Sequence, residues 1–439
     1  MAVAKLLDAV ADFLPAGVEG LRRQLPIEFV EEALAATGVA TLRRRRLPAE
    51  QVIWLVLGMA IHRDRPIFDV ARKLDIALPG EGAIAPSALA QARARVGSEP
   101  LKWLFERTAV SWTERYSLSS RWRGLELLAI DGTTLCTADT EQNRAHFGAQ
   151  EGPTGSSAYP MVRLLVLLQL GTHLMRAARF GPYATSEHDL AQQVRADIPD
   201  RSLTIVDRNF HGATLLYNLE RDGQDRHWLR RMRSNNVWKV IETLGPGDEI
   251  VEMTVSDRAR KDDPTLPHRW RMRAIRYKRG GGTDDVLLTS MLDAEKYPAK
   301  EIAELYRLRW EIELAYDELK THLNQQSQTM RSKTVTGVKQ ELWGLLLAYN
   351  LIRLEMARVA RTLKVEATRI SFLGSLRFIW REWSFDAVAS PGAIPRHLKK
   401  LQEDLASLLL PPRRANRSFP RALKVRSRRY PRKTPLIAK

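Results

Sequence analysis

Two short apolar segments, each followed directly by an aspartate, constrain the fold of this 439-residue chain most strongly. LELLAI runs into Asp131, and LTIV runs into Asp207. Both segments are typical of buried strands, and catalytic groups gather at the ends of such strands because the loops there open onto a crevice. Each aspartate also has a purely structural interpretation, since Asp-Gly is a turn dipeptide and Asp207 can cap the helix that follows it.

The sequence around these strands alternates between helical and extended patterns. Residues 1 to about 118 read as helices, two of which open on a proline suited to the first turn. MVRLLVLLQL, then GTH, then LMRAARFG predicts a hairpin of two long strands. Residues from about 227 to 292 form short alternating segments between Gly- and Pro-containing turns, which predicts a β-rich insertion. Helices resume at about residue 299.

The charge balance points to a polyanionic partner. The 69 Lys and Arg outnumber the 51 Asp and Glu, which gives a formal net charge of +18. Such an excess favours nucleic acid over an anionic membrane, although a merely soluble basic protein is the simpler alternative. Residues 413–439 contain eleven Lys and Arg and no Asp or Glu, which predicts a phosphate-binding arm; a nuclear localisation signal has a similar composition. Its candidate contacts are Arg413, Arg414, Arg428 and Arg429.

Two further arginine-rich stretches lie in the N-terminal helical region. The run RRRR comprises Arg43, Arg44, Arg45 and Arg46. Farther on, PIFDVARKLDIAL and PSALAQARARVG predict two short helices with a turn between them, a pattern similar to a helix-turn-helix. In that arrangement, Arg93 and Arg95 would project from the second helix toward DNA. A helical bundle with an arginine-rich surface explains the same residues equally well.

Cysteine usage and hydropathy indicate a soluble intracellular protein. Cys136 is the only cysteine, which excludes an internal disulfide and a multi-cysteine metal site and fits a reducing compartment. The longest apolar run, around MVRLLVLLQL, is too short to span a bilayer and contains an arginine. We therefore expect no membrane association.

The segment YRLRWEIELAYDELK carries an unusual polar stripe. Successive residues of a helix turn by about 100°, so five of its polar side chains fall within a sector of roughly 80°. These five are Tyr306, Arg309, Glu313, Asp317 and Lys320. Glu311 and Glu318 fall well away from that sector. The simpler interpretation is a solvated helix face with ordinary pairs between its acidic and basic residues.

Together with the two aspartates, this stripe can supply a metal site. Asp131, Asp207 and Glu313 would form an all-oxygen ligand set, which suits Mg²⁺ or Mn²⁺. Two such ions about 3.5–4 Å apart can activate a water and stabilise the leaving oxygen in phosphodiester cleavage. Arg309 offers bidentate contact to a phosphate, and Lys320 offers a point charge.

Four residues of the stripe match a family signature. Tyr306, Arg309, Glu313 and Lys320 have the spacing Y-x2-R-x3-E-x6-K, which resembles the signature of bacterial insertion-sequence transposases of the insertion-sequence-4 family. The segments IDGTTL around Asp131, GPYATSEHDL, and IVDRNFHG around the second aspartate are also similar to that family. The resemblance extends over nearly the whole chain.

The resemblance implies an α/β (α+β) fold with an RNase H-like catalytic core that contains a β-rich insertion. Residues 1–118 would form an N-terminal helical domain for DNA binding and assembly. Residues 119–370 would form the catalytic domain, with the insertion at about 227–292. Residues 371–439 would form a basic, helical and extended C-terminal region.

The resemblance also implies an activity and a set of roles. Asp131, Asp207 and Glu313 would be catalytic residues that bind two Mg²⁺ ions, for which Mn²⁺ can substitute. Tyr306, Arg309 and Lys320 would hold DNA phosphates near the cleaved end.

The expected reaction is cut-and-paste transposition in the bacterial cytoplasm, at the nucleoid. A homodimer would cleave the inverted-repeat ends of an insertion sequence in double-stranded DNA and join the 3′-hydroxyl ends to target DNA. A metal-dependent nuclease without strand transfer and an inactive DNA-binding relative are the alternatives. Some relatives hold a flipped base on a tryptophan of the insertion; Trp238 and Trp270 are candidates here, although a core position explains each more simply.

Overall fold

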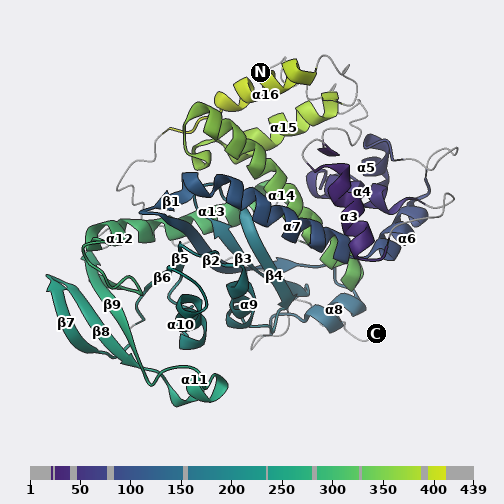
Figure 1. Cartoon of the computed structure of the whole chain (residues 1–439). Coiled ribbons are helices and arrows are strands. Elements are labelled where there is room, and N and C mark those ends of the chain that lie inside the picture. Colours follow the sequence, from purple (N-terminus) through teal and green to yellow (C-terminus); the bar gives the residue numbers. More distant parts are fainter. Residues whose placement is uncertain are drawn as a thin grey trace.

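The computed structural model describes residues 21–22, 25–39, 47–76, 84–151, 157–233, 236–278, 284–325, 329–386 and 394–411. Its centre is a mixed β-sheet with helices on both faces (Figure 1). The N-terminal helices lie at one end of the molecule, and a twisted group of strands extends from the opposite end.

Ten strands of the described residues form one sheet, in the order β4-β3-β2-β5-β6-β10-β9-β8-β7, with β1 paired to β2. Their bounds are β1 Arg121–Trp122, β2 Leu125–Cys136, β3 Met161–Gln169, β4 Met175–Pro182, β5 Ser202–Val206, β6 Arg226–Arg231, β7 Lys239–Gly245, β8 Asp248–Thr254, β9 Arg269–Lys278 and β10 Asp284–Thr289. The strands β2, β5 and β6 pair in parallel, and the remaining pairs are antiparallel. The predicted hairpin is confirmed as β3 and β4.

The helices fall into three groups along the chain. The N-terminal group is α3 Ile27–Ala36, α4 Ala49–Ile61, α5 Ile67–Lys73, α6 Pro86–Val96 and α7 Glu99–Tyr116. Among and after the strands come α8 Glu141–Phe147, α9 Glu187–Val194, α10 Ala213–Arg221, α11 Asp257–Asp262, α12 Ala299–Leu305 and α13 Trp310–Asp317. The last group is α14 Val335–Leu363, α15 Phe372–Asp386 and α16 Ile394–Ala406. Short 3₁₀ segments are η1 Ser117–Ser120, η2 Arg195–Asp197, η3 Tyr306–Arg309 and η5 Ala367–Arg369, and η4 Glu318–Leu323 is a π-helix.

Alternate residues of β2 enter two separate cores, as the period of two of a strand requires. Leu127 and Ala129 belong to the larger core, which contains residues of α4, α7, α13 and α14. Leu128 and Ile130 belong to the smaller core, which contains residues of α9 and α10. The sheet is therefore covered on both faces, and its strands are apolar on both sides.

The long helix α14 joins the N-terminal helices to the rest of the molecule. Every residue of α4 except Glu50 and Gln51 is buried, which is expected of a helix that is apolar on nearly all sides. The backbones of α4 and α14 approach so closely that a Cβ on Gly344 would lie 2.6 Å from Cγ1 of Val56. Because one apolar core runs through the N-terminal helices and the sheet, the boundary at residue 118 stays a prediction.

The β-rich insertion begins later than the sequence indicates. Strand β6 lies inside the predicted range of 227–292, yet it pairs in parallel with β5, Val206 opposite Arg230. It is therefore part of the central sheet, and the antiparallel strands β7 to β10 extend this sheet by pairing β10 with β6. The basic tail lies outside the described residues, as do Arg43, Arg44, Arg45 and Arg46.

Within the described ranges, every helix is too short or too polar to cross a lipid bilayer.

Candidate active site

The register of two parallel strands places Asp131 beside Asp207. The parallel pairing of β2 with β5 ends at Ile130 opposite Val206, and the next residue of each strand is an aspartate. The prediction that Asp131 ends its strand is wrong, because β2 continues to Cys136 through antiparallel pairing with β3. Only the parallel pairing with β5 stops here, at Ile130, one residue before Asp131.

The carboxyl group of Asp131 lies in a negatively charged environment. Burial raises its pKa to about 6, and the nearby Asp207 and Glu187 add to this effect. The backbone N–H of Gly132, which donates to Oδ1 at 2.8 Å, and the charge of Arg309 act in the opposite direction without outweighing it. A raised carboxyl pKa means that the site favours further positive charge.

The polar stripe does not lie on one regular helix. The structure divides the segment into the 3₁₀ turn η3, the helix α13 and the π-helix η4, so a constant turn of 100° per residue does not hold. Glu313 lies within the regular part. It accepts a hydrogen bond at 2.7 Å from Nη2 of Arg309, the residue one turn before it.

Arg309 interacts with all three candidate carboxylates. Its guanidinium binds Glu313 directly and is close enough to lower the pKa of Asp131. Burial lowers the pKa of Arg309 itself, but the hydrogen bond that Arg309 donates to Glu313 and the charges of Glu313 and Asp207 help to outweigh burial and raise it. Arg309 is therefore a permanent cation inside an acidic site.

Asp207, Tyr306 and Arg309 line a cavity of about 350 Å³. The remaining lining residues are Arg231, Tyr277, Lys278, Ala303, Arg307 and Trp310. Burial raises the pKa of Tyr306 to about 12, so its hydroxyl remains a hydrogen-bond donor at neutral pH. One carboxylate, that of Asp207, among four cationic side chains is an arrangement suited to the binding of a phosphate group.

The helical segment follows strand β2 past Asp131. The hydroxyl of Tyr316 donates at 2.5 Å to the backbone carbonyl of Asp131. Nζ of Lys320 donates at 3.1 Å to Oγ1 of Thr133 and at 3.1 Å to the carbonyl oxygen of Thr134. Tyr316 and Lys320 are four residues apart, which corresponds to about 6 Å along a helix, and Asp131 and Thr133 are two residues apart, or about 6.6 Å along a strand. The two contacts therefore have similar spacing on both elements.

Comparison with known proteins agrees with this geometry. Residues 15–106 match the family described as insertion element 4 transposase N-terminal, and residues 122–351 match the transposase DDE domain. The chain is 39% identical over 438 residues to the transposase InsG for insertion sequence element IS4 of Escherichia coli (strain K12), covering 98% of each protein. The chain belongs to the IS4 transposase family.

Other relatives of this transposase are shorter or more distant. The putative transposase InsZ of Escherichia coli (strain K12) is 39% identical over 241 residues, which covers 53% of this chain and 79% of that protein. A solved structure of a piggyBac transposase synaptic complex with hairpin DNA is similar with a TM-score of 0.43 and 15% identity, over 88% of this chain and 84% of that one.

Transposases with a DDE domain normally use a divalent metal ion. In the part of the chain that the structure describes, no three His, Cys, Asp or Glu side chains are grouped closely enough to hold one. Glu313 is hydrogen-bonded to Arg309. Asp131 and Asp207 nevertheless fit such an ion, because both are oxygen donors that directly follow the last paired residues of β2 and β5.

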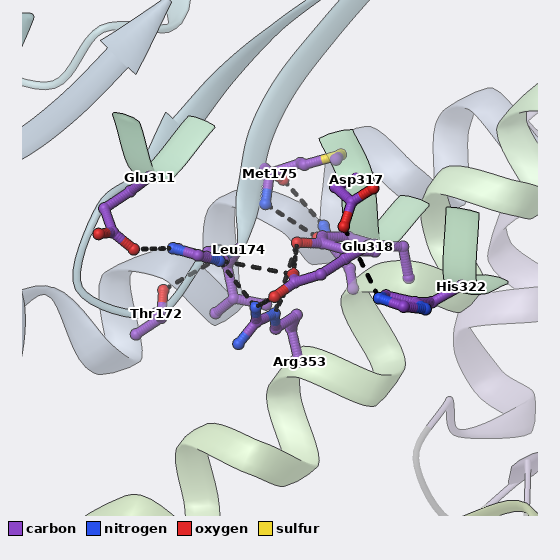
Figure 2. Close-up of polar contacts among 11 residues, drawn as sticks. Thr172, Leu174, Met175, Glu311, Asp317, Glu318, His322 and Arg353 are labelled. Atoms are coloured by element: carbon purple, nitrogen blue, oxygen red, sulfur yellow. Dashed lines mark hydrogen bonds and ion pairs between the residues drawn. The ribbon is translucent and has the colours of Figure 1, made fainter. Parts of the chain in front are cut away.

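Asp317 shares the predicted sector but takes part in local pairs. Its Oδ1 accepts at 2.6 Å from Oγ1 of Thr321, and its Oδ2 lies 3.7 Å from Nε2 of His322 (Figure 2). The assignment of Glu313, and not Asp317, to the metal site stays a prediction.

Sequence reasoning missed Glu187, whose charge acts on Asp131, and Arg163, which binds Glu187. A Cβ on Gly132 would lie 2.7 Å from Cδ of Glu187, so the side chain of Glu187 would have to move if residue 132 were larger. Nη1 of Arg163 donates at 3.0 Å to Oε1 of Glu187. The Ser186 cap of α9 is readable in the sequence and is confirmed, but only the fold brings this helix against β2.

The two predicted DNA contacts in α6 have different surroundings. Arg93 donates from Nε to Oε1 of Gln340 at 2.7 Å and from Nη2 to Oγ of Ser332 at 3.0 Å, which ties α6 to the start of α14. Arg95 is exposed. Arg93 also lines a cavity of about 820 Å³ together with Arg63 and Lys333. The role of both residues in DNA binding stays a prediction.

Trp270 occupies a core position in the insertion. It is buried, with its ring 5.1 Å from that of Trp228 and 5.8 Å from that of Tyr217. Trp238 is half-buried against the same core. Trp238 is therefore the more accessible of the two tryptophans considered for a flipped base.

Proposed function

We propose that this transposase moves its insertion sequence by a cut-and-paste reaction, with Asp131, Asp207 and Glu313 as catalytic residues. The observation that carries the proposal is the register of β2 and β5, which ends one residue before both aspartates. The inclusion of Glu313 is supported by its hydrogen bond to Arg309, whose charge also lowers the pKa of Asp131.

The acidic residues would hold the metal. Asp131 and Asp207 would bind two Mg²⁺ ions, for which Mn²⁺ can substitute, and Glu313 would complete the ligand set. When bound, the ions would supply an activated water and stabilise the leaving oxygen. Arg309 binds one carboxylate oxygen of Glu313, so the other oxygen would be available to a metal ion, and the guanidinium of Arg309 could also contact a DNA phosphate.

The basic and hydroxyl groups of the site would hold double-stranded DNA. Tyr306 and Arg309 line the cavity beside Asp207, where a backbone phosphate of an inverted-repeat end would lie. Lys320 lies farther along β2, near Thr133, and would contact the next part of the same strand. The basic C-terminal region and the N-terminal helices, residues 371–439 and 1–118, would extend this surface.

The complete reaction would need two copies of the chain. Two inverted-repeat ends and one target DNA are joined, so we infer a homodimer with one active site for each end. The substrate is chromosomal DNA, and the reaction would take place at the nucleoid.

The proposal is tested by strand joining. Purified protein is incubated with a labelled inverted-repeat end, supercoiled target DNA and Mg²⁺. We expect cleavage at the end followed by joined products, and we expect Asp131→Asn, Asp207→Asn and Glu313→Gln to bind the end without cutting it. Cleavage without joining would identify a nuclease, and binding without cleavage by the unmodified protein would identify an inactive relative.

A further inference from the structure

A buried polar cluster lies behind the helix that carries Glu313. Glu311 differs from Glu313 by two positions, or about 200° of helical turn, so it points away from the active site. Glu318 follows the last residue of α13 and lies on the same rear side. Figure 2 shows both carboxylates converging with Arg353 of α14 beneath the turn that joins β3 to β4.

The contacts of this cluster are specific and numerous. Arg353 donates to Glu318 with Nε at 3.1 Å to Oε2 and with Nη2 to Oε1, a bidentate pair. The hydroxyl of Tyr349 donates at 2.8 Å to Oε2 of Glu318. His173, in the turn between β3 and β4, has Nδ1 2.7 Å from Nη2 of Arg353 and Nε2 2.9 Å from Oε2 of Glu311. We name these five residues the anchor cluster.

Hydrogen-bond chemistry fixes the state of His173. Arginine only donates, so Nδ1 of His173 must accept from Arg353. The ring is then neutral, and its remaining N–H, on Nε2, donates to Glu311. His173 thus relays the hydrogen bonding of Arg353 to the first turn of α13, while Arg353 holds Glu318 just beyond the last turn.

Two attachment points fix a helix more completely than one. Glu311 and Glu318 are seven residues apart, or about two helical turns, which spans the whole of α13. His173 adopts a left-handed backbone conformation with φ of 60°, which non-glycine residues rarely do. The side chain of Arg353 is 1% exposed, so its charge depends on this pairing.

The contact between Glu318 and Arg353 lies at the start of the π-helix η4. The π-helix η4 begins at Glu318, and Lys320 lies within it. Single π turns often occur at functional sites, where they redirect a side chain. On the front of the segment, Tyr316 and Lys320 contact Asp131 and Thr133 of β2.

We infer that His173, Glu318 and Arg353 are positioning residues that set the place of Glu313 and Lys320 relative to Asp131. The anchor cluster binds both ends of α13, through Glu311 and Glu318. On the opposite side of the segment, Tyr316 and Lys320 then remain aligned with their partners in β2. The inference rests on the proposed function, because it assumes that Glu313 acts together with the two aspartates.

The test separates positioning from mere stabilisation. Mn²⁺ binding to the full-length protein without DNA is measured by electron paramagnetic resonance, and the metal concentration for half-maximal end cleavage is measured in parallel. Glu318→Gln removes the charge that Arg353 binds, and Arg353→Lys keeps a charge but loses the bidentate contact. Either variant should weaken Mn²⁺ binding by about tenfold and shift the activation midpoint likewise, as expected for residues that orient metal ligands.

A matched control uses another buried ion pair. Arg273 is fully buried and binds Asp248 through Nε at 2.7 Å and Nη2 at 2.6 Å, within β8 and β9. Asp248→Asn should lower the thermal stability to a similar degree without changing Mn²⁺ affinity. If Glu318→Gln does not fold, Arg353→Lys provides the same comparison.

Two outcomes would overturn the inference. One is unchanged Mn²⁺ affinity and activation midpoint in the folded anchor variants, and the other is an equal shift in Asp248→Asn. The proposed function fails in a different way: Asp131→Asn would then bind Mn²⁺ as well as the unmodified protein does.

Discussion

At the scale of single residues, the site is built from groups whose surroundings give each a distinct state. Asp131 is buried near other carboxylates, and its pKa is raised to about 6. Arg309 is the cation that interacts with these carboxylates, and it binds Glu313. Gly132 follows Asp131 and leaves the space that Glu187 fills. The smallest side chain in the site therefore determines how closely α9 approaches β2.

Replacing Gly132 should disturb the site more than an ordinary glycine replacement does. In Gly132→Ala, the new Cβ meets the carboxylate of Glu187, so β2 or the Glu187–Arg163 pair must move. We expect a loss of about 1–3 kcal/mol in the free energy of unfolding, as for other overpacked sites, together with reduced end cleavage. Denaturant unfolding and a cleavage assay measure the two effects.

Gly245 supplies the control for that substitution. A Cβ there meets no atom within 4 Å and its backbone has no positive φ, so Gly245→Ala should leave stability and cleavage nearly unchanged. Equal behaviour of the two variants would show that the contact between Gly132 and Glu187 is unimportant.

At the scale of elements, the sequence predicts the strands and the hairpin well but not the form of the helix that carries Glu313. The apolar runs before Asp131 and Asp207 identify β2 and β5, because burial of both faces leaves a clear local pattern. The division into η3, α13 and η4 has no such pattern. It coincides with contacts between Glu318 and Arg353, which are 35 positions apart, and only the fold brings these together.

The continuation of β2 beyond Asp131 was unpredictable for a similar reason. Asp-Gly favours a turn locally, yet residues 131–136 find partners in β3. Glu187 could not be assigned to the site either, because its approach to Gly132 depends on how α9 packs against the sheet.

The ion pair between Glu318 and Arg353 should make the free energy of unfolding depend on pH under acidic conditions. Burial alone would raise the pKa of this carboxyl, but the charge and hydrogen bonds of Arg353 outweigh burial and lower it to about 2. A lowered pKa stabilises the folded state above the unfolded pKa, and this contribution is lost as pH falls toward 2. The difference corresponds to about 3 kcal/mol.

Comparison with Glu318→Gln isolates this contribution. The gap in unfolding free energy between the unmodified protein and the variant should be largest above pH 5 and should shrink as the pH falls from 4.5 toward 2. Chemical denaturation at several pH values gives this gap. A gap that stays constant with pH would contradict the assigned ionisation of Glu318.

At the scale of the whole molecule, the net charge of +18 suits a protein that binds DNA. The N-terminal helices pack on α14, so they are held firmly relative to the active site. The family assignment covers both regions, with matches over residues 15–106 and 122–351. The sequence signature identified the family because four residues of one segment have the spacing that its members share.

Removal of the basic tail should change the salt dependence of DNA binding. Truncation after Leu410 removes eleven Lys and Arg in residues 413–439 and no acidic residue. Fewer phosphates would then be neutralised, so affinity should fall and its dependence on salt concentration should flatten. Binding of end DNA is measured at several salt concentrations; an unchanged slope would show that the tail makes no phosphate contacts.

The central claim is that Asp131, Asp207 and Glu313 hold the catalytic metal, and metal preference tests it most directly. A thiolate prefers softer metals than a carboxylate does, so Asp207→Cys should lose end cleavage in Mg²⁺ and regain part of it in Mn²⁺. Asp317→Cys, on the segment of Glu313 but bonded to Thr321, should cleave in both metals. If Asp207→Cys instead cleaves equally in Mg²⁺ and Mn²⁺, Asp207 is not a metal ligand and the proposed site is wrong.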